Sequence, residues 1–364
     1  MASAIKERIT TRNSSIELLR IICILGVIIL HYNNPDNGAA FSFVRKNTLQ
    51  WFLCHFLESV FIIAVDVFMI ISGYFLARNK QIKFWRPIEL IVRVIVYSVG
   101  LYLLSVILGK SFSLKSLGRC LLPCNYFVIL YCAVYIVSPY VNICLSRLST
   151  KSLKILLVLL FCIFSLEPWL VNLLENITGC LFNGLSFCGI IGSQSGYDFV
   201  NFLLMYILGA SLKFFSENGG EKKSTFVYLG INFICSLVIL LLDYLDIPCV
   251  YDYEMPILVI NALFIFKFFE SLKINSKVIN FLASGSFSVF LLHFIFMDKI
   301  KVEWACSQNI FVMLLHIFTS SILIYLICFC CHLIYELTVT KLLKRIQSKI
   351  KLELLIEEKK TTDE

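Results

Sequence analysis

The fold is decided by residues 14–31, which read SSIELLRIICILGVIILH. This apolar segment has an arginine, Arg20, near its start and a histidine, His31, at its end. Eleven helical steps of about 100° bring the direction of His31 back to within about 20° of that of Arg20, roughly 16 Å further along the axis. Because a charged side chain in a membrane helix usually faces protein or water, this spacing predicts that both residues face one interior space.

Composition places the chain among membrane proteins. Of its 364 residues, 59% are hydrophobic and 15% are charged, and the mean hydropathy is +0.85. Apolar runs of about 20 residues, the length of a helix that crosses a bilayer, recur along the chain and predict an all-α polytopic bundle. The 15 cysteines lie mostly in such runs, where they behave as small hydrophobes, so no disulfide framework is expected. Cys328-x-x-Cys331 lies in one of these runs, and we expect no metal site there.

The apolar runs divide the chain into about ten expected spans. They lie near residues 15–32, 51–77, 88–108, 126–145, 153–173, 199–215, 225–243, 255–270, 281–298 and 310–336. We expect residues 1–14 to form a cytoplasmic segment, residues 15–336 one membrane domain and residues 337–364 a charged cytoplasmic tail. The first span opens with Ser14-x-x-Glu17, the spacing of a capping box.

The distribution of lysine and arginine predicts the orientation of the bundle. With the N-terminus inside, the outer segments contain few basic residues, namely Arg45, Lys46, Lys110, Lys115, Arg119, Lys299 and Lys301. The inner segments contain more than twice as many even without the tail, so an N-in, C-in topology is expected. The net charge of +8 is thereby explained by topology, and no nucleic-acid partner is expected.

Two polar residues in the first two spans are candidate catalytic groups. A neutral imidazole takes up a proton near physiological pH, so His31 is a candidate general base. Asp66 lies near the middle of the second span, where a carboxylate needs a partner, and we expect it to orient or charge-stabilise His31. The alternatives are an interfacial histidine and a structural carboxylate bonded to a neighbouring helix.

Arginines near the cytoplasmic side are candidates for binding a phosphorylated donor. The guanidinium of Arg20 is a planar fork of donors suited to phosphate, and an intrahelical pair with Glu17 is the alternative. Arg86 and Arg93 begin the third span. The alternative for Arg86 is ordinary positive-inside charge, whereas Arg93 lies deeper and is expected to face protein or a ligand phosphate.

Three further residues complete the candidate site. Ser72, in the inner half of the second span, is a candidate for the donor, although Ser72-Gly73 is also a small pair that permits close helix packing. His293 lies at mid-depth of the ninth span, with an ordinary interhelical hydrogen bond as the alternative. Glu58, three residues after His55 near the outer end of the second span, is a candidate contact for an outer acceptor.

Four segments of the chain resemble motifs of the acyltransferase-3 family of membrane O-acyltransferases. They are Arg20-x10-His31 in the first span, Asp66 to Tyr74 in the second, Tyr126 to Pro139 in the fourth and Ser286 to His293 in the ninth. The resemblance extends over about residues 13–336. One departure is that the Arg-x-x-Arg of the family, after the second span, is here Lys83-x-x-Arg86, and lysine lacks the planar fork.

The resemblance implies an enzyme of the bacterial cytoplasmic membrane that moves an acyl group, expected to be acetyl, from cytoplasmic acyl-CoA to a hydroxyl of a cell-surface or lipid-linked polysaccharide. It implies acetyl-CoA, or another acyl-CoA, as donor and a surface or lipid-linked glycan as acceptor. The expected donor ligands are Arg20, Ser72, Arg86 and Arg93, and the expected acceptor ligands are His293, Glu58 and Tyr126. The alternative is a glycan or lipid transporter whose pathway is lined by Arg20, Asp66 and His31.

Overall fold

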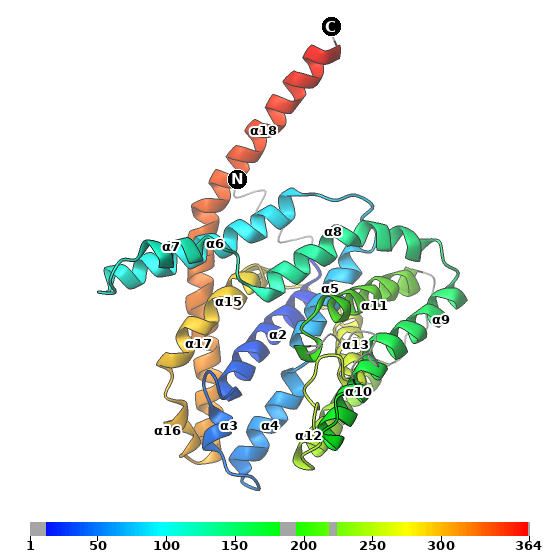
Figure 1. Cartoon of the computed structure of the whole chain (residues 1–364), viewed down its shortest axis with the longest axis vertical. Coiled ribbons are helices and arrows are strands. Elements are labelled where there is room, and N and C mark those ends of the chain that lie inside the picture. The colour runs from blue at the N-terminus through cyan, green and yellow to red at the C-terminus, as the bar shows by residue number, and fades with distance from the viewer. Residues whose placement is uncertain (1–11, 183–193, 218–223, 363–364) are drawn as a thin grey trace.

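The computed structural model describes residues 12–182, 194–217 and 224–362. Throughout this part of the chain the regular elements are helices, which confirms the expected all-α class (Figure 1). The helices are α2 (Ser14–Asn33), α3 (Ala40–Phe43), α4 (Leu49–Phe61), α5 (Ala64–Leu76), α6 (Trp85–Ile107), α7 (Leu114–Cys120), α8 (Tyr126–Ser146), α9 (Thr150–Phe161), α10 (Glu167–Thr178), α11 (Phe199–Glu217), α12 (Thr225–Tyr244), α13 (Pro256–Ser271), α14 (Lys277–Ala283), α15 (Ser286–Leu292), α16 (Val302–Cys306), α17 (Ile310–Leu337) and α18 (Val339–Thr362). Short η segments occupy Cys162–Leu166, Gln194–Gly196 and His293–Lys299 (η3).

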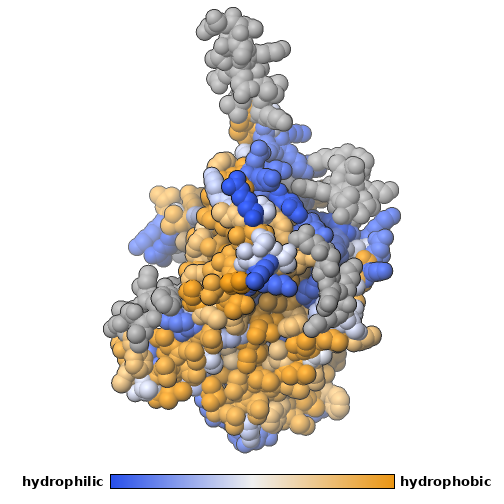
Figure 2. All heavy atoms as spheres, turned by 90° about the vertical axis from the view of Figure 1, so that its right-hand side faces the viewer, coloured by the Kyte–Doolittle hydropathy of each residue, from blue (hydrophilic) through white to orange (hydrophobic). Residues whose placement is uncertain are grey.

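Nine helices or helix runs in the described ranges are long and apolar enough to cross a membrane. The eighth expected span, at 255–270, is not among them: it is α13, which has only 16 residues and therefore a length of about 24 Å. It lies inside the bundle, with Leu258, Ala262 and Phe266 fully buried. Figure 2 shows a broad apolar surface on the face around α9, with hydrophilic residues gathered above it, as a membrane-embedded bundle requires.

The start of α2 and the end of α17 lie at the same end of the bundle (Figure 1). The Ser14 hydroxyl accepts a hydrogen bond from the Ser276 amide at 3.0 Å, just before α14. At the other end of α14, Ser284 lies 3.4 Å from the His332 ring in the last part of α17. The two termini of the membrane domain therefore share one side, as the predicted N-in, C-in topology requires, while the choice of the cytoplasmic side stays a prediction.

The start of α2 differs from the expected capping box. Asn13 is the N-cap, and its side-chain oxygen accepts from the amides of Ser15 and Ile16. The Ser14 and Ser15 hydroxyls instead bond to the backbone between α13 and α14, with Ser15 donating to the Leu272 carbonyl at 2.9 Å. The N-cap therefore lies one residue before the position predicted from the sequence, because both serine hydroxyls form hydrogen bonds with another segment of the chain.

The second expected span is two helices, α4 and α5, which are separated at Ile62 and Ile63. Helix α5 crosses α11 at very close range, because a Cβ at Gly73 would collide with a backbone oxygen of α11, and a Cβ at Gly209 would collide with one of α5. The close approach expected for Gly73 is therefore confirmed. This crossing decides which residues of α5 face α11 and which face the interior of the bundle.

Candidate active site

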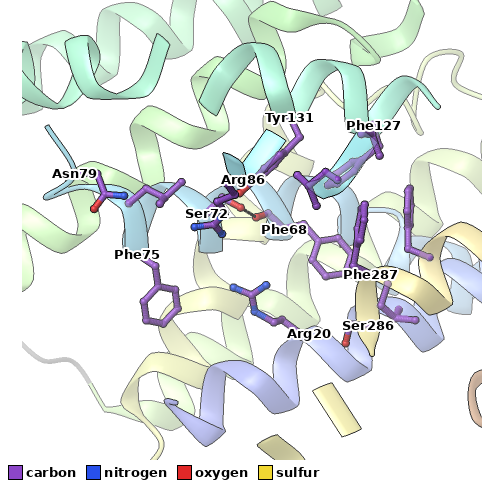
Figure 3. Close-up of a pocket in the computed structure, with 15 residues that line it drawn as sticks. Arg20, Phe68, Ser72, Phe75, Asn79, Arg86, Phe127, Tyr131, Ser286 and Phe287 are labelled. Carbon is purple, nitrogen blue, oxygen red and sulfur yellow. Dashed lines mark hydrogen bonds between the residues drawn. The ribbon is translucent and has the colours of Figure 1, made fainter. Parts of the chain in front are cut away.

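A cavity of about 420 Å³, here called the inner cavity, lies between α2, α5, α6, α8 and α15. Figure 3 shows its polar lining, with the Arg20 side chain entering it from α2 and facing the side of Ser72 and Arg86. The polar residues that line it are Arg20, Ser72, Asn79, Arg86, Tyr131 and Ser286. Three of the four residues predicted to bind a donor therefore meet in one space.

The surroundings of Arg20 are compatible with both of the roles considered for it. Its Nε lies 3.8 Å from Oε1 of Glu17, one turn earlier, so the intrahelical pair exists. The Nε is buried, and no residue in the described ranges accepts a hydrogen bond from it. Because the guanidinium also lines the inner cavity, it has donors left for an anionic ligand.

Asn142 of α8 holds the segment that lines the inner cavity where α5 ends. Its side-chain amide donates to the carbonyls of Leu76 at 2.8 Å and Asn79 at 2.9 Å, where α5 ends. Tyr206 donates to the Asn142 side-chain oxygen at 3.0 Å. The Arg86 guanidinium lies over the Tyr135 ring at 5.5 Å, a cation–π contact that leaves its edge available for hydrogen bonds. The hydroxyl of Ser72 already donates to the Phe68 carbonyl, so toward a ligand it can only accept.

A second cavity, of about 320 Å³ and here called the outer cavity, lies at the His31 end of α2. The polar residues that line it are His31, Asn34, Glu58, Asn125, Tyr126, Tyr197, Tyr253 and His293. It brings together His31 and all three residues predicted to bind an acceptor. Histidines, a carboxylate, amides and aromatic rings in one chamber suit a polyhydroxylated ligand.

A turn directly after α2 orients the His31 ring. The Nδ1 atom lies 2.6 Å from the side-chain oxygen of Asn37. Since that oxygen only accepts, Nδ1 carries the hydrogen and Nε2 has a free lone pair. The Gly38 amide donates to the His31 carbonyl at 2.9 Å, and a Cβ at Gly38 would collide with the Tyr32 backbone. The turn that presents Asn37 to the ring therefore depends on glycine.

His293 is a second imidazole in the outer cavity. Its ring centroid lies 5.0 Å from that of His31. The Nδ1 atom lies 3.1 Å from the Val289 carbonyl, which can only accept, so Nδ1 is the donor here too. The Nε2 of this 3%-exposed side chain has no hydrogen-bond partner among the described residues. Two neighbouring imidazoles thus each carry an uncommitted nitrogen lone pair.

Glu58 is buried in the wall of the outer cavity. The Asn33 side-chain amide donates to its Oε2 at 2.9 Å. His55, one turn earlier, does not line this cavity: it forms a hydrogen bond with Asp243 and stacks on Trp51 with ring centroids 3.9 Å apart. Of the His55–Glu58 pair, only the carboxylate can meet a ligand in the outer cavity.

Asp66 and Arg93 lie outside both cavities. The Asn201 side-chain amide donates to Asp66 at 3.1 Å, and within the described residues no hydrogen bond joins Asp66 to His31. Asn37 holds the position at the ring that was expected for Asp66. The Arg93 guanidinium pairs with Glu336 at 3.0 Å and donates to Ser288 at 3.5 Å, which ties α6 to α17 and α15. Asp66 thus has the geometry of a structural carboxylate bonded to a neighbouring helix, and Arg93 faces protein.

The two cavities share a wall, and the single space predicted from the Arg20–His31 spacing is divided in two. Arg20 lines the inner cavity and His31 the outer one, so both do face the interior of the bundle. Phe290 of α15 lines both cavities. The sequence predicted the common face, but a side chain from a distant helix divides the space beside it.

Several residues in or beside the outer cavity were missed from the sequence. Asn37 had a local signal, since it lies in a polar loop just after His31. Asn125 had a weaker one, as the N-cap of α8 next to Tyr126. Tyr197 and Tyr253 had no sequence signal, because they come from loops far apart in the chain. A 3.1 Å hydrogen bond joins their hydroxyls.

These features define the class of the protein as a multi-pass membrane protein with a basic cavity and a histidine cavity along one central helix. The sequence model of a family described as an acyltransferase domain matches residues 13–339, which is most of the chain. The chain belongs to this family, the acyltransferase-3 family, and is a membrane acyltransferase that uses an acyl donor. No curated protein and no solved structure matches it.

Proposed function

We propose that the enzyme transfers an acetyl group from cytoplasmic acetyl-CoA to a hydroxyl of a cell-surface or lipid-linked polysaccharide, in the cytoplasmic membrane of a bacterium. The observation that carries this proposal is the pair of cavities on one face of α2, one lined by arginines and the other by histidines. Family membership supports acyl transfer over the alternative of a transporter.

The inner cavity suits the donor. Arg20 and Arg86 supply charged donors for the phosphates of CoA, and planar guanidinium groups bind phosphate with two parallel hydrogen bonds. The rest of the lining is largely apolar, including Phe68, Phe127 and Phe287, and suits the pantetheine arm. Lys83 replaces the other arginine of the family motif, so Arg20 and Arg86 carry the planar recognition.

The outer cavity suits a sugar. Tyr126, Tyr197 and Tyr253 supply aromatic faces and hydroxyls, and Glu58 accepts hydrogen bonds from ligand hydroxyls. A glycan reaching this side of the bundle would place one hydroxyl at the His31 ring. This arrangement keeps the acceptor on the opposite side of Phe290 from the donor phosphates.

The free Nε2 lone pair of His31 makes it the general base. It takes the proton of the acceptor hydroxyl as the oxygen attacks the thioester carbonyl, and a tetrahedral intermediate forms. The carbon–sulfur bond then breaks, an ester remains on the acceptor, and the departing thiolate takes the proton from His31 to give CoA. Asn37 holds the ring in the required tautomer and stabilises the imidazolium that forms in between. A positioned general base contributes about 10²- to 10⁴-fold to such a step.

The proposal is tested on membranes of cells that make the protein, with labelled acetyl-CoA added and ester-linked label in the polysaccharide counted. We expect His31→Gln to lose transfer and Arg20→Ala to lose most of it at low acetyl-CoA concentration, whereas the matched controls His316→Gln and Arg78→Ala keep it, because neither residue lines the inner or the outer cavity. Normal acetylation in His31→Gln would show that His31 is not the general base. In cells, deletion of the enzyme should leave polymer on the surface without ester groups, whereas deletion of a transporter would block its delivery.

A further inference from the structure

Phe290 occupies an unusual position in the core. It packs against both of the large apolar clusters of the bundle, yet its side chain is only partly buried because it faces a cavity on either side. Its ring centroid lies 4.9 Å from that of Phe127 and 6.1 Å from that of His293. Phe290 therefore lies in the wall that the inner cavity shares with the cavity of the proposed catalytic histidine.

The backbone that carries Phe290 is anchored more firmly than the ring. Ser288, on the same short helix, accepts a hydrogen bond from Tyr97 at 2.8 Å and lies 3.1 Å from Nδ1 of His332. The helix then changes to the 3₁₀ segment η3 at His293. Because Ser288 is held by α6 and α17 while Phe290 borders a cavity on two sides, a rotation of the Phe290 side chain would join the cavities.

We propose that Phe290 is the partition between donor and acceptor and sets the length of acyl group that the enzyme transfers. The inference rests on the proposed function. With CoA phosphates at Arg20 and Arg86, the thioester carbonyl must pass the Phe290 ring to reach His31. The acyl group then lies against the Phe290 ring, and each methylene added to the acyl chain would collide with that ring. A single methylene in a close-fitting pocket changes discrimination by roughly 10- to 200-fold.

The experiment uses the full-length protein in inverted membrane vesicles that contain the native acceptor. The label that acetyl-CoA or butyryl-CoA transfers to the polymer is counted after its release by alkali, which cleaves esters. CoA binding is measured separately on purified protein by thermal shift. In Phe290→Ala, the ratio of butyryl to acetyl transfer should rise about tenfold or more. In Phe290→Trp, acetyl transfer should fall at least about tenfold while CoA still binds, because the larger ring fills the passage and leaves the arginines in place.

Two variants of the flanking walls are matched controls. Phe68 lines only the inner cavity and Leu291 only the outer one, so alanine at either position should leave the butyryl-to-acetyl ratio near that of the wild type. An unchanged ratio in Phe290→Ala, or an equal rise in Phe68→Ala, would overturn the proposal. If Phe290→Ala does not fold, Phe290→Trp decides, and full acetyl transfer in that variant rejects the partition. Failure of the wild type to bind CoA or transfer any acyl group would reject the proposed function instead.

Discussion

The hydrogen bond between His31 and Asn37 predicts a specific kinetic defect. Asn37→Leu removes the oxygen that lies 2.6 Å from Nδ1 and leaves the size of the side chain similar. While the imidazolium exists, this hydrogen bond is charge-assisted and worth about 1.5–3 kcal/mol. Because a tenfold change in rate corresponds to about 1.4 kcal/mol, kcat should fall roughly 10- to 150-fold.

The loss should appear in kcat and not in the KM for acetyl-CoA, because Asn37 is at the opposite end of α2 from the inner cavity. Asn37→Asp keeps an acceptor oxygen and should retain more activity than Asn37→Leu. Asp36→Asn is the matched control, since Asp36 is exposed in the same turn. Initial rates at several acetyl-CoA concentrations, normalised to protein in the membrane, give both constants. A wild-type kcat in Asn37→Leu would refute this role for the hydrogen bond.

Three further outcomes follow from the same coordinates. Gly38→Ala should lower kcat as Asn37→Leu does, because a Cβ there would collide with the Tyr32 backbone and displace the turn that holds Asn37. Equal rates in Gly38→Ala and wild type would contradict this. Gly73→Ala should destabilise the protein by about 1–3 kcal/mol in thermal unfolding, whereas Gly100→Ala, whose Cβ meets open space, should not; equal melting temperatures would speak against the close crossing of α5 and α11. Arg20→Ala should raise the KM for acetyl-CoA about tenfold or more, because Arg20 lines the inner cavity. Arg93→Ala should lower the melting temperature with a smaller effect on KM, because Arg93 pairs with Glu336. The opposite pattern would indicate that Arg93 binds the donor.

The local part of the site was predictable because it lies on single helices. Arg20 and His31 share one face of α2 through helical periodicity alone, and both do line the interior of the bundle. Gly73 was predicted to allow close packing and does so against α11. The pairing of His31 was not predictable in this way, because Asp66 turns toward Asn201 at the crossing that Gly73 permits.

The sequence by itself determined the all-α membrane class, the family, and the face of α2 that carries Arg20 and His31, because apolar run length and helical period act within single segments. Only the tertiary structure decided that two cavities replace one, that Phe290 divides them and that Tyr197 meets Tyr253. Periodicity gives the direction of a side chain relative to its own helix. The rotation and depth of one helix against another depend on side-chain packing across the whole bundle.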